Sequence, residues 1–266
     1  GDVWQYALSL SRSLQAYDVE VHLATMGPLP DEQQRADAAA VSNLRLYEST
    51  YKLEWMAEPW EEIEQACMWL LYLEQEIRPD VVHLNSYVFG EIPWDCPVIV
   101  VAHSCLLSWW QSKNDTDVPN KWQTYRQRVS KGLKAADQVV AVSHFMQDQL
   151  EQHYGTSPNS EVIYNGLDVS TPRGEKKPQA FSLGSVWNEW ENLQIFQQAP
   201  EGSEWPLYLA DDGSEQLFSN LKNVSYLGKL SREEVKKYLR SSALYIDASR
   251  YESFGLAVLE AASHGC

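Results

Sequence analysis

The sequence is poor in cysteine, and the cysteines it has are not arranged to bind a metal or to form a disulfide framework. Only four occur among 266 residues, and none stands in a C-x-x-C spacing or in a pattern shared with histidine. Structural zinc sites and small disulfide-rich folds need such spacings. We therefore expect reduced thiols, a cytoplasmic protein and no metal site. The four are Cys67, Cys96, Cys105 and Cys266.

Long apolar runs, a secretory leader and a dinucleotide-binding glycine motif are also missing. The longest apolar stretches, Cys67–Leu73 and Pro97–Ala102, are far shorter than the roughly 18–20 residues that a membrane-spanning helix needs. No G-x-G-x-x-G follows an expected strand, which argues against a dehydrogenase. The chain opens on Gly1 without a methionine, so we expect that a segment precedes it.

Positive charge is scarce. The chain has 21 Lys and Arg against 37 Asp and Glu, which gives a formal charge of −16. Such a chain repels a phosphate backbone at long range, so we expect no nucleic-acid partner. Hydrophobic residues make up 44% of the sequence, which is enough for globular domains and excludes a disordered chain.

Helical and strand periodicities alternate along the chain, which predicts an α/β fold with parallel sheets. The run Pro97–Ala102 is apolar at every position, as a strand covered on both faces requires. One expected helix begins at Asp2, and the others are Pro59–Ile77, Asn120–Ala136, Phe145–Tyr154, Trp190–Gln198, Arg232–Leu239 and Gly255–His264. The expected strands are Val19–Thr25, Asp80–Asn85, Pro97–Ala102, Val139–Ser143, Val162–Tyr164, Ala180–Gly184, Leu207–Ala210, Val224–Leu227 and Ala243–Asp247.

One segment, 168–179, is rich in proline and basic residues and has no apolar periodicity, which predicts a linker. It separates residues 1–167 from residues 180–266, and each part has the alternating pattern of a doubly wound domain. The first part opens on a helix instead of a strand, and the second has too few strands for a full doubly wound sheet. We therefore expect both domains to be truncated at the chain ends.

The segment Ser249–Cys266 carries the clearest chemical signal. Gly255 opens an expected helix at the carboxyl edge of a sheet, where free backbone N–H groups suit a phosphate. Glu252 and Glu260 flank this helix start, and carboxylates accept paired hydrogen bonds from the vicinal hydroxyls of a ribose or hexose. The combination indicates a nucleotide sugar. A capped amphipathic helix that packs its apolar side inward is the equally plain alternative.

The same residues match a known signature. Two glutamates with seven residues between them, around Phe-Gly-Leu and followed by Ala-Ala and Gly-Cys, resemble the motif of family 4 retaining glycosyltransferases, which have the GT-B fold. The segments Asp80–Asn85, Gly132–Ser143 and His153–Asp168 resemble first-domain segments of that family. The resemblance implies two Rossmann-like domains facing a cleft. It further implies metal-independent transfer of a hexose, with retention, from a UDP-, GDP- or ADP-sugar substrate to a glycan, glycolipid or small acceptor, with no cofactor.

The resemblance also implies roles for single residues. Glu260 would bind the nucleotide ribose and Glu252 the hexose hydroxyls, without acting as a covalent nucleophile. His103, at the end of an expected strand, would reach the transferred sugar as a catalytic residue, or would simply be a strand-end histidine bonded to Ser104 or backbone. The remaining implied donor-site residues are Gly1, Ser185, Phe254, Gly255 and Leu256, of which Gly1 ends a glycine-bearing loop.

One departure from the family pattern concerns the departing diphosphate. The family places an Arg and a Lys where this chain has Ser185 and Glu191. Because charge grows on the leaving group, the loss of such cations costs rate. Lys229 and Arg250 are candidate substitutes, and a pseudoenzyme that binds a ligand or partner without transfer is the main alternative. A sugar-nucleotide epimerase or a phosphorylase is a third alternative.

One segment is basic although the chain as a whole is acidic. The helix expected at Asn120–Ala136 has five basic residues between Lys121 and Lys134 and no acidic one. It could meet anionic lipid headgroups, giving a peripheral membrane contact, or a phosphorylated acceptor; a solvated helix face is the plain alternative. Trp109 and Trp110 lie in an expected loop, Cys105–Asp115, and could stack on acceptor sugar rings or be buried.

Overall fold

The computed structural model describes residues 2–114, 116–155, 159–167, 174–183, 204–210 and 223–266. The chain divides into two compact units, Gly1–Asn165 and Gly166–Cys266. Every strand pairing in the described residues is parallel, as the unbroken apolar runs predict. Among these residues, no helix combines the length and the apolar character that crossing a bilayer requires.

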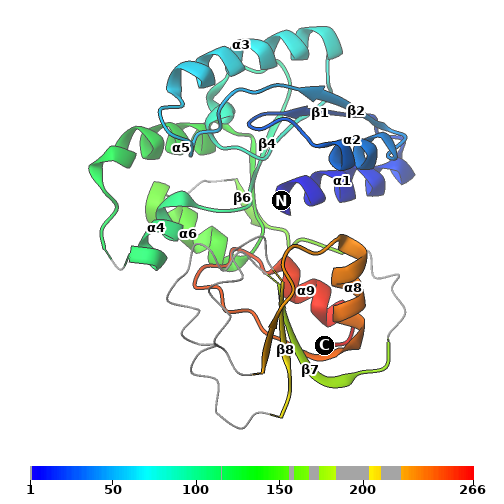
Figure 1. Cartoon of the computed structure of the whole chain (residues 1–266). Coiled ribbons are helices and arrows are strands. Elements are labelled where there is room, and N and C mark those ends of the chain that lie inside the picture. Colours follow the sequence, from blue (N-terminus) through cyan, green and yellow to red (C-terminus); the bar gives the residue numbers. More distant parts are fainter. Residues whose placement is uncertain (1, 115, 156–158, 168–173, 184–203, 211–222) are drawn as a thin grey trace. The chain divides into compact units, whose positions relative to one another are not determined.

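The first half of unit 1 is a two-stranded sheet covered on both faces. The strands β1 (Val21–Thr25) and β2 (Leu44–Glu48) pair in parallel. Figure 1 shows α1 (Asp2–Leu14) and α2 (Glu32–Ala39) on one face and α3 (Trp60–Ile77) on the other. A short 3₁₀ turn, Gln15–Tyr17, follows α1. Leu8, Ala38 and Val41 form the buried core of the α1 and α2 side.

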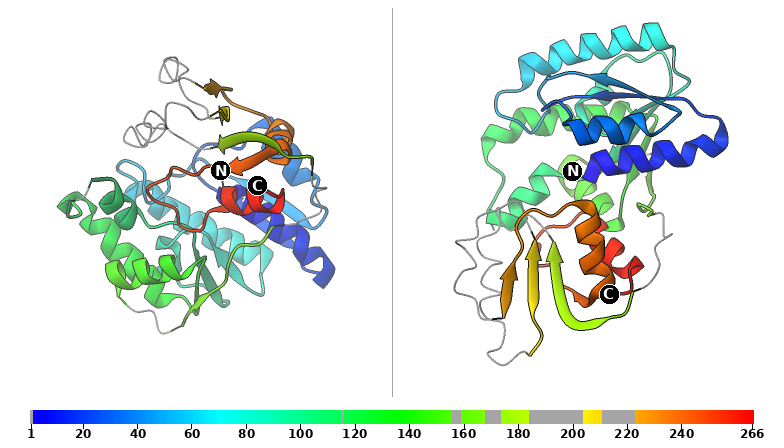
Figure 2. Two further views of the ribbon diagram at one scale, coloured as in Figure 1. Left: turned by 90° about the horizontal axis from the view of Figure 1, so that it is seen from below. Right: turned by 45° about the vertical axis from the view of Figure 1, so that its right-hand side comes forward.

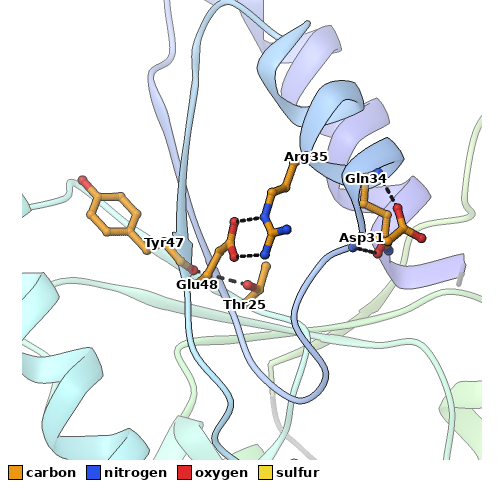
Figure 3. A network of polar contacts seen from close by, with 6 residues as sticks. All are labelled: Thr25, Asp31, Gln34, Arg35, Tyr47 and Glu48. Carbon is orange, nitrogen blue, oxygen red and sulfur yellow. Dashed lines mark hydrogen bonds and ion pairs between the residues drawn. The ribbon is translucent and has the colours of Figure 1, made fainter.

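The helix α2 and the strand β2 are absent from the sequence expectations, and polar contacts fix both (Figure 3). Asp31 and Gln34 form a reciprocal capping box at the start of α2. Arg35 donates two hydrogen bonds to the carboxylate of Glu48, at 2.8 and 2.7 Å, which ties α2 to the end of β2. The helix has only one buried residue, so it has no apolar stripe for periodicity to detect.

The second half of unit 1 is a four-stranded parallel sheet in the order β3-β4-β5-β6. Its strands are β3 (Val82–Leu84), β4 (Val98–Ala102), β5 (Gln138–Ala141) and β6 (Ser160–Val162). Its helical segments are η2 (Val88–Glu91), α4 (Leu106–Asn114), η3 (Asn120–Trp122), α5 (Gln123–Ala135) and α6 (His144–Tyr154).

Two expectations for this half are wrong. The expected loop Cys105–Asp115 is largely the helix α4, because Leu107 is buried and Cys105 accepts hydrogen bonds from the first turn. The strand expected at Val162–Tyr164 lies two residues earlier, since β5 pairs with Ser160–Val162, and Ile163 and Tyr164 are exposed. Burial depends on the register of pairing, which apolar residues alone do not fix.

A close backbone approach joins α5 to η2. A Cβ atom on Gly132 would lie 1.9 Å from the Tyr87 carbonyl oxygen, and one on Gly90 would lie 2.4 Å from the Gly132 carbonyl oxygen. Real Cβ atoms do not approach that closely, so both positions require glycine. The contact holds the loop after β3 against α5.

Unit 2 is a four-stranded parallel sheet in the order β10-β7-β8-β9. Its elements are β7 (Lys177–Leu183), β8 (Leu207–Ala210), β9 (Val224–Tyr226), α8 (Arg232–Ser241), β10 (Ser242–Tyr245) and α9 (Leu256–Ser263). Figure 2 shows α8 and α9 on one face of this sheet, where Phe181, Leu239 and Ala261 share a core. The helix expected near Trp190–Gln198 lies outside the described residues.

The expected linker, 168–179, is too long at its carboxyl end. Residues 168–173 lie outside the described part of the chain, and β7 already begins at Lys177, which pairs with Ser242. The Gln179 side chain donates to the hydroxyls of Ser241 and Ser242 at 3.1 Å. These polar contacts hold residues that lack apolar periodicity in the sheet.

Candidate functional site

The start of α9 is built from a glycine and a glutamate. Gly255 has a φ of +86°, a left-handed conformation in which glycine avoids the strain of a Cβ atom. Glu252 Oε1 accepts hydrogen bonds from the backbone N–H groups of Gly255 at 3.0 Å and Phe254 at 3.4 Å. The carboxylate therefore shapes the loop that leads into the helix, and it occupies two of the N–H groups expected to face a donor.

Three carboxylates gather beside one phenol at the carboxyl edge of this sheet. Burial raises the pKa of the Tyr245 phenol, and nearby negative charges raise it further. These charges belong to Asp247, Glu252 and Glu260. The Tyr245 hydroxyl donates to the carbonyl of Leu183, the last residue of β7, at 2.9 Å. The end of β7, the end of β10 and the start of α9 thus form one acidic region, at the edge where α/β proteins bind ligands.

Some predicted donor-site residues are described and others are not. Phe254 and Leu256 are half-buried beside Gly255, and the candidate cations Lys229 and Arg250 are both exposed. Three positions lie outside the described residues: Gly1, Ser185 and Glu191.

In unit 1, His103 follows β4 and contacts residues from two other elements. Its Nε2 lies 2.8 Å from Oδ1 of Asn85, which follows β3, and not against Ser104. The ring of Tyr6, from α1, meets the His103 ring edge-on with centroids 4.5 Å apart. The Tyr6 hydroxyl also lies 3.4 Å from Nε2 of His83. Because Trp4 and Leu8 of α1 pack on the β1 and β2 side, α1 joins the two sheets of unit 1 at this histidine.

The His103 ring is neutral at physiological pH. Burial, and to a smaller extent the nearby His83, lower its pKa to about 4. With the Asn85 carbonyl oxygen assigned as the acceptor, the neutral ring carries its proton on Nε2. His103 can therefore accept a hydrogen bond from a ligand at Nδ1, and it supplies no positive charge.

A buried glutamate supports the loop that carries Asn85. Glu54 is 4% exposed and accepts hydrogen bonds from the Ser86 hydroxyl at 2.5 Å and the Tyr87 backbone N–H at 3.1 Å. Burial raises the pKa of the Glu54 carboxyl, while these two hydrogen bonds lower it. The Tyr87 hydroxyl donates to the carbonyl of Ser104 at 2.5 Å. Glu54 therefore connects the loops after β2 and β3, and Tyr87 connects the loop after β3 to that after β4.

Sequence reasoning singled out His103 and missed its neighbours Tyr6, Asn85 and Glu54. An acidic residue set directly between apolar neighbours, Leu53 and Trp55, is a signal that could have found Glu54. An Asn at the end of an expected strand could have marked Asn85 in the same way. Tyr6 has no such signal.

The basic charge of η3 and α5 is divided among different contacts. Arg128 pairs with Glu64 of α3 and, at 2.7 Å, with Glu91 of η2, so its charge is neutralised inside unit 1. The Lys121 ammonium lies 5.2 Å from the ring centroids of both Trp110 and Trp122. Of the five basic residues between Lys121 and Lys134, Arg128 is therefore engaged inside unit 1.

Solved structures with the same arrangement identify the class of fold. Sucrose-phosphate synthase from Thermosynechococcus elongatus matches with a TM-score of 0.73 and 16% identity, over 98% of this chain and 73% of that chain. Anabaena HepE, in complex with UDP and glucose, matches with a TM-score of 0.69 and 16% identity, over 100% of this chain and 76% of that chain. These likenesses, together with the two parallel α/β units, show a GT-B fold.

Family models identify the family. The model described as Glycosyltransferase Family 4 matches residues 3–171, and the model described as Glycosyl transferases group 1 matches residues 193–266. The chain therefore belongs to glycosyltransferase family 4. An uncharacterized glycosyltransferase of Methanocaldococcus jannaschii is 23% identical over 132 residues, which are 47% of this chain and span 37% of that protein.

Proposed function

We propose that this protein transfers a hexose from a nucleotide sugar to an acceptor, with retention of configuration and without a metal. The observation that carries the proposal is the start of α9, where a left-handed glycine and two glutamates meet at the carboxyl edge of a parallel sheet. A helix start suits a diphosphate, and the carboxylates suit sugar hydroxyls. The UDP and glucose named for HepE support a nucleotide-linked hexose as donor.

The hydrogen bonds of the loop refine the roles. Because Glu252 Oε1 already accepts two backbone N–H groups, the hexose hydroxyls would bind its other oxygen, Oε2. The diphosphate would bind the next N–H groups of the helix, those of Leu256 and Ala257. Glu260 would bind the ribose.

Unit 1 would supply the acceptor side and His103. The neutral His103 ring, oriented by Asn85 and Tyr6, would accept a hydrogen bond at Nδ1 from a hydroxyl of the transferred sugar. The acceptor would be a glycan, a glycolipid or a small molecule. Activity in the cytoplasm, with peripheral contact to a membrane, is part of the same proposal.

The test is calorimetric titration of the intact protein with UDP, GDP and ADP, without and then with magnesium, followed by the matching sugar nucleotides. The substitution Glu260→Ala should weaken binding of the nucleotide by about 1.5–3 kcal/mol, as expected for hydrogen bonds to a charged group. The matched control is Glu233→Ala, which removes an exposed carboxylate from α8. Equal affinity in the Glu260 variant and the wild type would overturn the role of Glu260.

A pseudoenzyme is the second candidate, raised by the identities of Ser185 and Glu191, although the family and fold matches do not favour it. Such a protein would bind a nucleotide or a partner and transfer nothing. Mass spectrometry of donor and acceptor mixtures separates the two candidates: a glycosylated acceptor supports the transferase, and unchanged donor in the presence of measured nucleotide binding supports the pseudoenzyme.

A further inference from the structure

A cavity lies in unit 1, between α5 and the end of α6. Its volume is about 410 Å³, within the range of small-molecule sites. It is lined by Arg126, Gln127, Ser130, Lys131, His153 and Tyr154. None of these six residues belongs to the donor region of α9 or to the contacts around His103.

The wall of this cavity favours an anion. Two of its residues, Arg126 and Lys131, are exposed cations, Gln127 and Ser130 add polar groups, and none of the six carries a carboxylate. The lining is therefore positively charged, although the chain as a whole has a formal charge of −16. An Arg and a Lys beside hydroxyl and amide groups are the donors that phosphate oxygens accept.

The cavity is built on fixed elements. Arg126 Nε donates to the His153 carbonyl at 3.1 Å, and the Ser130 hydroxyl donates to the Tyr154 carbonyl at 3.2 Å. These bonds tie α5 to the last turn of α6. The close approach of Gly132 to the Tyr87 carbonyl holds α5 from its other side.

A buried imidazole in the wall lacks a partner. His153 is 6% exposed, and its Nε2 has no hydrogen-bond partner among the residues that the structure describes. Burial lowers the pKa of His153, and the nearby Arg126 charge lowers it further, so the ring is neutral at physiological pH. A buried polar atom without a partner is costly, but this Nε2 atom is itself shielded from solvent, so the binding of an anion in the cavity depends on Arg126 and Lys131.

Two neighbouring basic residues outside the cavity are engaged in other contacts. Arg128 of α5 is paired with Glu64 and Glu91, and the Lys121 ammonium of η3 lies over tryptophan rings. We propose that the cavity between α5 and α6 binds a phosphate group, either of an anionic lipid headgroup or of a soluble phosphate ester. The volume leaves room for the alcohol to which the phosphate is attached.

The test compares two lysines of the same helix. Lys131 lines the cavity, and Lys134 is an exposed lysine of α5 outside it. Titrations of the intact protein use inorganic phosphate and glycerol phosphate, and sedimentation uses vesicles of phosphatidylcholine alone or in equimolar mixture with phosphatidylglycerol. We expect Lys131→Ala to weaken binding of the phosphate probes about fivefold, as for one cation at an anionic surface, and Lys134→Ala to leave it unchanged.

The arms of the test distinguish the source of the phosphate. Loss of sedimentation with the mixed vesicles in Lys131→Ala alone assigns a lipid headgroup, while loss of glycerol phosphate binding without any vesicle binding assigns a soluble ester. Lys131→Met, which keeps the apolar stem, repeats the measurement if the alanine variant has a lower melting temperature. Equal losses in the Lys131 and Lys134 variants, or no binding of any probe, would overturn the proposal. The readout is binding alone, so a failure here is independent of the transfer reaction.

Discussion

Glu252 and Gly255 are joined by a hydrogen bond of 3.0 Å from the glycine N–H to the glutamate carboxylate, three residues apart at the start of α9. The same carboxylate that the family resemblance assigns to the donor hexose therefore acts first as a capping group for its own loop. This hydrogen bond already fixes the side chain, so the proposed contact with a hexose would need no further ordering of the loop. Such preorganisation reduces the ordering cost of binding.

Two substitutions separate these tasks of Glu252. Glu252→Gln keeps an oxygen that can accept from Gly255, so we expect a small change in unfolding free energy and a clear loss of donor affinity. Glu252→Ala removes the oxygen that accepts from Gly255 as well as the contact proposed for the donor. It should lower the unfolding free energy by about 1 kcal/mol, as for a lost helix cap. Urea denaturation and calorimetry measure the two effects. A Gln variant that loses as much stability as the Ala variant would contradict the separation.

The left-handed conformation of Gly255 has its own test. Nothing lies closer than 3.6 Å to a Cβ built at this position, so the constraint is the φ of +86° and not space. We expect Gly255→Ala to lower the unfolding free energy by about 1–3 kcal/mol. Gly255→Asn should lower it less, because asparagine enters the left-handed region more readily. The reverse order of the two variants in denaturant unfolding would show that strain is not the cause.

At Gly132 the constraint is space. A Cβ atom there would lie 1.9 Å from the Tyr87 carbonyl oxygen, so α5 and η2 must move apart in Gly132→Ala. Overpacking of this kind costs about 1–3 kcal/mol. The control is Gly166→Ala, where no atom lies within 4 Å of the added Cβ. Thermal unfolding of the two variants should show a loss at Gly132 alone.

Most strands of the sheets could be predicted from the sequence, but few of the polar contacts that hold the loops could. The strand β8, Leu207–Ala210, matches its expectation because a short apolar run needs no other information. The helix α2 was missed because five of its eight residues are polar or charged and the other three are alanines, although the capping residues Asp31 and Gln34 were readable. A capping pair is a local signal that periodicity ignores.

Contacts between distant residues were beyond prediction. Glu54 and Tyr87 are 33 residues apart, and their hydrogen bond depends on which loops the fold brings together. The same holds for Tyr6 and His103, whose rings meet only because α1 crosses to the second sheet. The family resemblance singled out His103, whereas its contact with Asn85 and its neutral charge state became known only from the structure.

The pKa of His103 predicts a pH dependence of stability. Its value of about 4 in the folded protein lies below the ordinary value of 6.5, so the unfolded chain binds a proton more readily. The free energy of unfolding should therefore fall as the pH is lowered from about 6.5 to about 4. His103→Gln should reduce the slope in this range, measured by urea denaturation at a series of pH values. Identical slopes in both proteins would show that folding does not weaken the binding of a proton to His103.

The last prediction concerns the departing diphosphate. Ser185 and Glu191 stand where the family resemblance implies an Arg and a Lys, and the carboxylate of Glu191 adds a charge of the same sign as the leaving group. Placing Arg and Lys at these positions, with Ser185→Arg and Glu191→Lys together, should raise the rate of transfer. A single electrostatic group at a transition state is worth about 10²–10³ in rate, so the double variant should gain at least one order of magnitude.

The measurement is the initial rate of nucleotide release with the donor that calorimetry identifies, for the wild type and the double variant. The matched control is Ser203→Arg with Glu201→Lys, which adds the same charges at other positions of unit 2. A gain in the double variant alone supports neutralisation of the leaving group at this site. Equal rates in all three proteins would mean that the leaving group is neutralised elsewhere, with Lys229 and Arg250 as the next residues to replace, because both are exposed cations in unit 2.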